Sequence, residues 1–327
     1  MPGMVTIAFA GNFAATLEPA VRARLAVPHA IVVADETAVI AKLPDTDVLV
    51  SLAFTREMAA AARRLRLVQV PGAGLDRIDR AALPAGVALA NVYGHEIGIA
   101  EYVMGAMLAL TRQLGRLDAA LRRGTWDSQW AVGVPPPPAW PELAGKTLGI
   151  LGFGHIGQAL ARRARGFDMT VLAVRRDPTQ PSADADVRGA GGLDEVLARA
   201  DYLAVTLPLT PATRGLLGSR ELGLMKRTAF LVNVARAEII DEDALFQALA
   251  GGRLAGAALD VWYRYPTTAV ATLPARRPFH ELPGVLMTPH VSGWTEGMLQ
   301  ARAQLIADNV HRIVRGEAPA NLIPRAE

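Results

Sequence analysis

The chain has 327 residues, no cysteine and a formal net charge of +3. This length exceeds one ordinary domain core, so we expect two domains, and the lack of cysteine excludes disulfides, thiolate metal sites and a cysteine nucleophile. Because the cationic residues are dispersed along the chain, we expect a small anionic partner and no nucleic acid.

Composition also bears on location. The lack of cysteine agrees with a cytoplasmic protein, and the N-terminal residues carry no basic region of the kind that begins an export signal. The longest apolar run, residues 102–110, is far shorter than the roughly 20 residues that span a bilayer, so we expect no membrane partner. The six histidines are scattered without the spacing of metal ligands, and no metal site is expected.

The first ninety residues alternate short β-rich runs with alanine- and arginine-rich stretches of helical period. This rhythm is typical of βαβ units and predicts a parallel sheet with strands at residues 5–11, 30–34, 47–52, 65–70 and 87–91. One apolar helix is expected next, at residues 99–122, where Val103, Met107 and Leu110 recur at intervals of three and four. Such a helix packs between domains or between subunits.

A proline-rich segment, residues 133–141, follows this helix. It cannot form a helix or a central strand, because proline lacks the amide donor and fixes φ, and it is interpreted as a stiff connector. Six further strands with intervening helices predict a second, doubly wound domain, at residues 147–152, 170–174, 201–207, 229–234, 256–261 and 285–288. One amphipathic helix, residues 296–315, is expected near the end of the chain.

Gly152, Gly154 and Gly157 form a G-x-G-x-x-G sequence between a predicted strand and a predicted helix. In that setting the glycines permit a tight turn, let the backbone approach a pyrophosphate and allow close packing of helix on strand. The helix N-terminus favours the anion. The turn, which also contains His155 and Ile156, therefore predicts a dinucleotide site, with a purely structural turn as the alternative.

The end of the second strand in such a domain normally carries an acidic residue that binds the 2′-hydroxyl of the cofactor ribose. Here this place holds Arg175 and Arg176, followed by Asp177. Two adjacent arginines suit a 2′-phosphate, so NADP is preferred to NAD. If both arginines are instead solvated, Asp177 binds the ribose and the cofactor is NAD.

Four separated motifs resemble those of the D-isomer-specific 2-hydroxyacid dehydrogenase family, in the family's order and over nearly the whole chain. They are VPGAGLDRID at residues 70–79, LPLTPATRG at 207–215, NVARAEIID at 233–241 and TPH at 288–290. The resemblance implies two doubly wound parallel-sheet domains: a Rossmann cofactor domain, residues 95–295, inserted in a flavodoxin-like substrate domain made of residues 1–94 and 296–327. Together with the apolar helix, it also implies a homodimer.

The resemblance further implies hydride transfer between a nicotinamide and a 2-keto or 2-hydroxy carbon. Arg236 would grip the substrate carboxylate, His290 would be the acid/base at the substrate oxygen, and Asp260 would hydrogen-bond the nicotinamide carboxamide. Other residues implied to bind the substrate are Gly72, Ala73, Gly74 and Ser292. Other residues implied to bind the cofactor are Pro208, Thr213, Val234 and Gly293.

One position departs from the family pattern. The family carries a glutamate that pairs with the catalytic histidine, and Tyr265 stands in its place here. A neutral phenol can orient an imidazole through a hydrogen bond, but it supplies no negative charge. Glu281 and Glu96 are alternative carboxylate partners, although each is more simply interpreted as a solvated surface residue.

Three functions remain open on these residues. The leading hypothesis is an NADPH-preferring reductase of small 2-keto acids such as glyoxylate or hydroxypyruvate, with Arg236, His290 and Tyr265 as its catalytic residues. The second is oxidation of a small anion in the manner of formate dehydrogenases, which also lack the glutamate. The third is a catalytically weak dinucleotide-sensing or corepressor-like protein, against which the retention of Arg236 and His290 argues.

Overall fold

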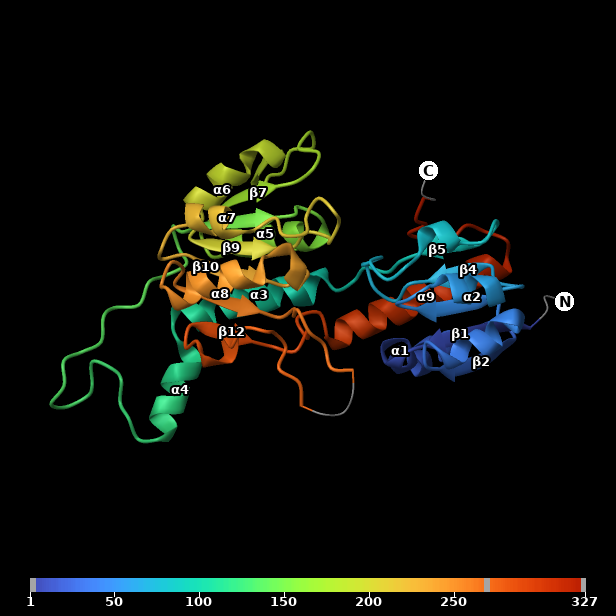
Figure 1. Ribbon diagram of the computed structural model, residues 1–327, viewed down its shortest axis with the longest axis horizontal. Helices are drawn as coiled ribbons and strands as arrows, with labels where there is room; N and C mark the ends of the chain where they lie inside the picture. The colour runs from blue at the N-terminus through green and yellow to red at the C-terminus, as the bar shows by residue number, and fades with distance from the viewer. Residues whose placement is uncertain (1–3, 268–270, 325–327) are drawn as a thin grey trace. The chain divides into compact units, whose positions relative to one another are not determined.

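The computed structural model describes residues 4–267 and 271–324. The chain divides into two compact units, one formed by Met1–His95 with Trp294–Glu327 and the other by Glu96–Gly293 (Figure 1). The domain boundaries expected from the sequence, after residue 94 and before residue 296, lie within two residues of this division.

The first unit is built on a parallel sheet whose strands run in the order β2-β1-β3-β4-β5. This is the strand order of flavodoxin-like folds, which confirms the expected fold class of this unit. Its strands are β1 (Val5–Ala10), β2 (His29–Ala34), β3 (Val48–Ser51), β4 (Leu67–Gln69) and β5 (Ala88–Ala90).

Both faces of this sheet are covered. Ile7 and Phe9 point to one face, where α1 (Asn12–Arg22) and α9 (Glu296–Val314) pack, because alternate residues of a strand point to opposite faces. Ala8 and Ala10 face the other side, which is covered by the 3-10 segment η1 (Ala38–Asp45) and α2 (Arg56–Ala61). The helix near the end of the chain therefore shares a core with the first strands (Figure 1).

The second unit holds a seven-stranded parallel sheet in the order β12-β11-β10-β9-β6-β7-β8, which is the doubly wound arrangement of a Rossmann domain. Six of its strands were expected, and β8 was not. This strand pairs beside β7 at the sheet edge, and its three residues, two of them charged, are too few and too polar to give a β pattern in the sequence. The strands are β6 (Thr147–Leu151), β7 (Thr170–Val174), β8 (Asp186–Arg188), β9 (Tyr202–Val205), β10 (Phe230–Asn233), β11 (Gly256–Leu259) and β12 (Val285–Met287).

Helices lie on both faces of the seven-stranded sheet. One face carries α3 (Glu96–Thr111) and α5 (His155–Arg165), which share an apolar core with Leu148 and Ile150 of β6. The opposite face carries α6 (Leu193–Arg199), α7 (Ser219–Leu224) and α8 (Glu242–Ala250). Among the described residues, no helix has both the length and the apolar character needed to cross a membrane.

The prediction of a single helix at residues 99–122 is wrong. The structure has two helices there, α3 and α4 (Leu114–Arg122), separated at Gln113, whose φ of 51° is left-handed. A left-handed residue interrupts the regular hydrogen-bond ladder, so α4 takes a new direction and leaves the sheet (Figure 1). The apolar period continues across the break, which is why the sequence gives no sign of it.

Residues 123–146 join α4 to β6 and contain no helix or strand, as the proline run predicts. The segment extends away from the body of this unit and returns to it (Figure 1). Trp126, Trp130 and Val132 are all exposed along it.

Candidate active site

The carboxyl edge of the seven-stranded sheet gathers the predicted residues of this unit. Because all seven strands are parallel, the residues that follow them meet at one edge. Gly152 follows β6, Arg175 follows β7, Arg236 lies three residues beyond β10, Asp260 follows β11, and His290 lies three residues beyond β12. This is the edge at which open α/β sheets bind ligands.

The glycine turn at this edge has different requirements at each glycine. Gly152 has a φ of 100°, and a Cβ there would lie 2.8 Å from backbone atoms of Thr206 and Leu207. A Cβ on Gly157 would lie 2.4 Å from the carbonyl oxygen of Gly152. A Cβ on Gly154 would meet nothing within 4 Å. Packing therefore demands the first and third glycines, whereas the middle one faces open space.

The N-terminus of α5 supports a dinucleotide site at this turn. The helix begins at His155, directly after its N-cap residue Gly154, which has no side chain to cap it. The first turn of a helix leaves backbone N–H groups without a partner in the helix, and these groups attract anions. The amides of this first turn, beside the open space at Gly154, fit the pyrophosphate of a dinucleotide.

At the end of β7, Arg175 is half-buried and Arg176 is exposed. Neither guanidinium makes a hydrogen bond or an ion pair within the described part of the chain. Asp177 is engaged in its own turn, because its Oδ1 accepts from the hydroxyl of Thr179 at 2.6 Å and from the amide of Thr179 at 3.0 Å. These hydrogen bonds lower the pKa of Asp177, and the charge of Arg175 lowers it slightly further.

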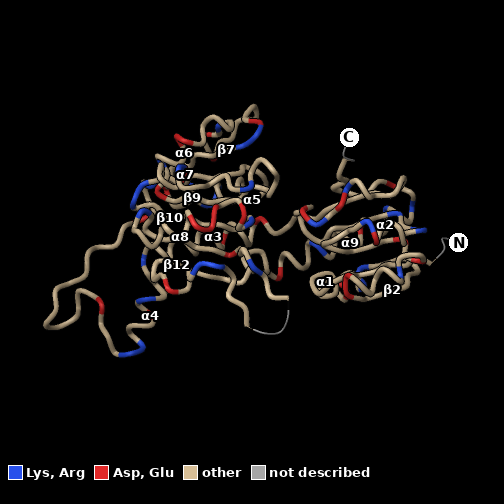
Figure 2. Tube along the Cα trace, in the orientation of Figure 1, with Lys and Arg blue, Asp and Glu red and all other residues tan. Residues whose placement is uncertain are grey.

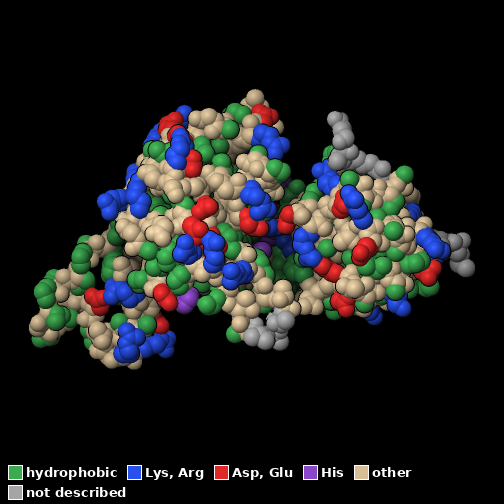
Figure 3. Space-filling view, viewed as in Figure 1, with side chains coloured by type: hydrophobic (Ala, Val, Ile, Leu, Met, Phe, Trp, Pro, Cys, Tyr) green, Lys and Arg blue, Asp and Glu red, His purple; other side chains and the backbone are tan. Residues whose placement is uncertain are grey.

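Other arginines nearby are paired with acids. Arg188 bonds Asp186 at 2.8 Å and Glu195 at 3.0 Å, and Arg199 also bonds Glu195. Figures 2 and 3 show the same mixture of basic and acidic residues across both units. Arg175 and Arg176 therefore stand out as cations available to an anion.

The loop after β9 carries Pro208 and Thr213. The hydroxyl of Thr213 donates to the Pro208 carbonyl at 2.7 Å and accepts from the Thr210 amide at 2.8 Å, which closes the loop on itself. The hydroxyl of Thr206 donates to the carbonyl of Gly152 at 2.6 Å and so ties this loop to the glycine turn. Val234 lies buried at the end of the adjacent β10.

His290 and Tyr265 lie together in the structure. The phenol oxygen of Tyr265 is 2.7 Å from Nδ1 of His290, and it also receives a long hydrogen bond of 3.4 Å from the amide of Trp262. Burial raises the pKa of Tyr265, and the Trp262 amide and the charge of Arg236 offset this only in part. The phenol therefore keeps its proton at neutral pH, and the contact is a hydrogen bond and not an ion pair.

Of the two alternative carboxylates, Glu281 lies beside a different histidine. Glu281 is exposed, and its carboxylate lies 3.8 Å from the imidazole of His280. Glu96 is the first residue of α3. Tyr265 is thus the residue that the structure brings to Nδ1 of His290.

Asp260 is completely buried beneath the loop that carries His290. Its Oδ1 accepts from the hydroxyl of Thr288 at 2.6 Å and from the Val291 amide at 2.9 Å, and its Oδ2 accepts from the Ser292 amide at 2.8 Å. Contact with a nicotinamide carboxamide stays a prediction for this residue. Gly293, half-buried, ends this unit.

Arg236 lies in a turn that Asn233 shapes. The buried amide of Asn233 donates to the Arg236 carbonyl at 3.0 Å and accepts from the Ala235 amide at 3.1 Å. The Arg236 guanidinium, which is half-buried, donates to the Ala235 carbonyl at 2.8 Å. A planar guanidinium held in this way can grip a carboxylate with two parallel hydrogen bonds.

In the first unit, Gly72, Ala73 and Gly74 form the loop after β4. The Gly72 carbonyl accepts from the Val92 amide at 3.1 Å, and the Ala73 carbonyl accepts from the side-chain amide of Asn91 at 3.0 Å. Within the described residues, no hydrogen bond uses the N–H groups of Gly72, Ala73 or Gly74. The carbonyls of Gly72 and Ala73 therefore bind groups of the protein, and the N–H groups of the loop can bind an acceptor on a ligand.

The sequence analysis did not identify the residues whose hydrogen bonds support the loop that carries His290. The hydroxyl of Tyr102, on α3, lies 2.6 Å from the hydroxyl of Thr288, and the indole N–H of Trp262 donates to the Thr288 carbonyl at 2.8 Å. The one available signal was a tyrosine hydroxyl inside the apolar run at residues 102–110, because a buried hydroxyl needs a hydrogen-bond partner.

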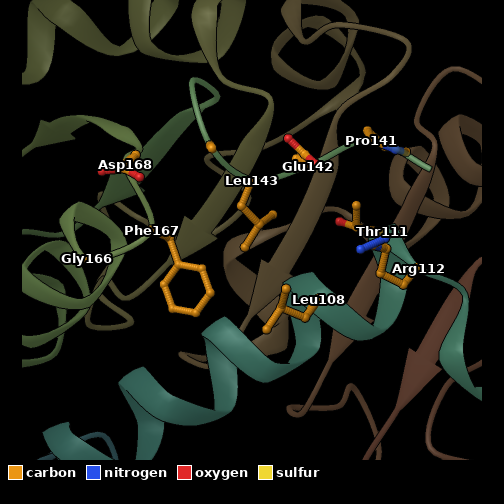
Figure 4. A pocket seen from close by; sticks show the side chains of 10 residues that line it. Leu108, Thr111, Arg112, Pro141, Glu142, Leu143, Gly166, Phe167 and Asp168 are labelled. Atoms are coloured by element: carbon orange, nitrogen blue, oxygen red, sulfur yellow. The ribbon is translucent and has the colours of Figure 1, made fainter. Parts of the chain in front are cut away.

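A cavity of about 320 Å³ lies elsewhere in this unit (Figure 4). Leu108 of α3 and Arg112, directly after that helix, line it, and Phe167 lines it from the turn that precedes β7. Residues 141–144, which precede β6, complete the lining. It therefore lies at the amino ends of the strands, away from the predicted site. Among the residues described, no group of three His, Asp or Glu side chains could hold a metal ion.

These features define a dinucleotide-binding domain of the Rossmann type, and comparison with known proteins agrees. The family described as "D-isomer specific 2-hydroxyacid dehydrogenase, NAD binding domain" matches residues 104–292. A D-isomer specific 2-hydroxyacid dehydrogenase family protein from Aeromonas salmonicida has a similar structure, with a TM-score of 0.82, 28% identity and coverage of 99% of this chain and 100% of that one.

Two relatives are similar in sequence. A glyoxylate reductase from Thermococcus gammatolerans is 35% identical over 288 residues, which are 86% of this chain and 84% of that protein. A D-3-phosphoglycerate dehydrogenase from Methanocaldococcus jannaschii is 36% identical over 290 residues, so the chain spans about half (52%) of that protein's length. The chain belongs to the D-isomer specific 2-hydroxyacid dehydrogenase family and is therefore an oxidoreductase with a nicotinamide dinucleotide-binding domain.

Proposed function

We propose that the protein is an NADPH-preferring reductase that converts small 2-keto acids, such as glyoxylate or hydroxypyruvate, to D-2-hydroxy acids. One observation carries the proposal: a histidine held at Nδ1 by Tyr265 lies at the same sheet edge as Arg236 and the glycine turn. The identity of about a third with glyoxylate reductases supports this substrate class.

Backbone N–H groups and arginine side chains form the part of the site that binds the cofactor. A bound nicotinamide dinucleotide supplies the hydride. The amides at the start of α5 hold its pyrophosphate beside Gly154, and Arg175 and Arg176 bind a 2′-phosphate through charge-assisted hydrogen bonds. The engagement of Asp177 with Thr179 supports NADP over NAD. Pro208, Thr213, Val234, Asp260 and Gly293 complete this part.

The substrate half of the site handles a carboxylate and a carbonyl oxygen. Arg236 grips the carboxylate, and Ser292, on the loop after β12, binds it too. In the first unit, Gly72, Ala73 and Gly74 stay predicted substrate ligands through their N–H groups. Because Tyr265 engages Nδ1 of His290, proton transfer to the substrate oxygen falls to Nε2. The phenol can accept from Nδ1–H or donate to bare Nδ1, so the contact persists in both protonation states of the imidazole.

The pairing of His290 with a phenol in place of a carboxylate also favours a second candidate, oxidation of formate. Formate oxidation releases carbon dioxide and needs no proton transfer to an alcohol oxygen, so a histidine without a carboxylate partner is tolerable there. A dinucleotide-sensing protein without turnover is the third candidate.

One experiment separates the three. A panel of 2-keto acids is assayed with NADPH and with NADH in parallel, beside formate with NADP+ and NAD+, and His290→Ala serves as the inactive control. We expect keto-acid reduction that is faster with NADPH. Turnover of formate alone would establish the second candidate, and cofactor binding without turnover of any substrate would establish the third.

We also infer a homodimer in the cytoplasm. Support comes from apolar side chains exposed on α4 and the segment after it, Leu114, Leu121, Trp126, Trp130 and Val132, of which Val132 is 98% exposed. Apolar patches of this kind mark protein interfaces. Light scattering of the purified protein, which reports its mass in solution, tests the dimer.

A further inference from the structure

Thr288 is the residue at which the hydrogen bonds behind His290 meet. Its hydroxyl lies 2.6 Å from both the Tyr102 hydroxyl and Oδ1 of Asp260. Its carbonyl accepts from the indole of Trp262 at 2.8 Å and from the amide of His290 at 3.1 Å. Thr288 therefore links α3, β11 and the loop that follows β12.

The direction of these bonds is fixed by the chemistry of the groups. Both oxygens of Asp260 accept backbone N–H groups, so the carboxylate acts as an acceptor and takes the single proton of the Thr288 hydroxyl. The Thr288 oxygen must then accept from Tyr102. Burial raises the pKa of Tyr102, so this donor keeps its proton. The chain runs from Tyr102 through Thr288 to Asp260.

The backbone at the end of this chain is strained. His290 has a φ of 58°, the left-handed region that non-glycine residues seldom occupy. In that conformation the next two amides, of Val291 and Ser292, point together at the two oxygens of Asp260. Successive amides beside a left-handed residue form a concave site for an anion, and here the anion is a side chain of the protein.

We propose that Tyr102 and Thr288 are positioning residues for His290. They keep the Asp260 carboxylate aimed at the amides of Val291 and Ser292, and this contact holds His290 in its left-handed conformation, with its imidazole against Tyr265. The inference rests on the proposed function for its effect on turnover, but its effect on the His290 side chain can be measured without substrate.

The structure offers a matched control for Tyr102. Tyr202 is a second tyrosine of the same unit whose hydroxyl bonds a threonine, Thr111, at 2.7 Å. Burial raises the pKa of Tyr202 as it does that of Tyr102. Tyr202→Phe removes the same kind of hydrogen bond as Tyr102→Phe, but the pair that it breaks has no link to Asp260.

The test compares these two variants. We expect Tyr102→Phe to lower kcat for keto-acid reduction about threefold to tenfold, and Tyr202→Phe to leave kcat unchanged at a similar loss of thermal stability. In NMR spectra without substrate, the imidazole resonances of His290, assigned with His290→Ala, should move only in Tyr102→Phe. Equal behaviour of the two variants in both measurements overturns the proposal.

A second pair of variants acts on Thr288 itself. Thr288→Val keeps the shape of the side chain and breaks the chain of hydrogen bonds, whereas Thr288→Ser retains the hydroxyl. We expect Thr288→Val to shift the His290 resonances and Thr288→Ser to leave them at their wild-type positions. If the wild-type protein reduces no keto acid, the proposed function fails, while the resonances still decide whether Tyr102 and Thr288 position His290.

Discussion

The phenol oxygen of Tyr265 lies 2.7 Å from Nδ1 of His290, so the imidazole is oriented by a neutral partner. In the family that this chain belongs to, a glutamate is the expected partner of this histidine. A carboxylate stabilises an imidazolium through its charge, whereas a phenol orients the ring without adding charge. The pH range over which the protein reduces its substrate should therefore depend on this one residue.

Tyr265→Glu tests that dependence. A carboxylate at Nδ1 favours the protonated imidazole, so His290 stays an acid at higher pH. We expect the pH at which the reduction rate falls to rise by about one unit or more. The pH profile of kcat gives the measurement. Tyr263→Phe is the control, because the Tyr263 hydroxyl donates to the Ile240 carbonyl and not to His290. If the pH profile of Tyr265→Glu equals that of the wild type, Tyr265 takes no part in proton transfer.

Arg236→Ala should remove the grip on the substrate carboxylate. We expect KM for the keto acid to rise at least about tenfold, because hydrogen bonds to charged groups contribute about 1.5–3 kcal/mol. Arg236→Lys should recover only part of this loss, since an ammonium cannot form two parallel bonds. Steady-state kinetics at saturating cofactor measure both. Arg220→Ala, which removes an arginine paired with Glu221, is the control and should leave KM unchanged. If Arg236→Ala also leaves KM at the wild-type value, Arg236 does not bind the substrate.

Arg175→Asp should reverse the cofactor preference. An aspartate at the end of β7 accepts the ribose 2′-hydroxyl of NADH and repels the 2′-phosphate of NADPH. We expect the ratio of the two Kd values, measured by fluorescence titration, to change at least about tenfold in favour of NADH. Arg199→Ala, which removes an exposed arginine paired with Glu195, is the control. An unchanged ratio would assign the ribose end of the cofactor to other residues.

The glycine turn predicts opposite behaviour for two alanine substitutions. Gly157→Ala places a Cβ 2.4 Å from the Gly152 carbonyl, so the helix or the turn must shift, at a cost of about 1–3 kcal/mol. Gly154→Ala meets no protein atom within 4 Å and should destabilise the apo protein less than Gly157→Ala, with only the small cost of an alanine at the N-cap of α5. It should nevertheless weaken cofactor binding, because the methyl group fills the space beside the pyrophosphate. Thermal melting of the apo protein and cofactor titration measure the two effects, and normal binding by Gly154→Ala would argue against a dinucleotide at this turn.

Much of the fold could be predicted from the sequence because strand and helix periods are local. The short apolar runs that became β6 and β9 are buried on both faces of a parallel sheet, and their spacing shows the βαβ order. The break at Gln113 could not be predicted, because a single left-handed residue leaves the apolar period intact. The edge strand β8 was not predicted, because its pairing with β7, and not its composition, makes it a strand.

The site divides in the same way. Gly152, Arg236 and His290 lie in contiguous motifs, so the sequence alone identifies them as candidates. The link from Tyr102 to Thr288 joins residues 186 positions apart, and only the packing of α3 against the sheet reveals it. The family resemblance implied a role for Asp260, but its place beneath the His290 loop depends on the backbone amides of Val291 and Ser292, which the residue types alone do not indicate.

The way Asp260 holds its loop has a consequence for directed evolution. It grips Val291 through the main chain, while the Val291 side chain is 41% exposed and takes no part in that contact. Position 291 can therefore be randomised without loosening the anchor of its neighbour His290. In a saturation library at this codon, most members should keep the wild-type melting temperature.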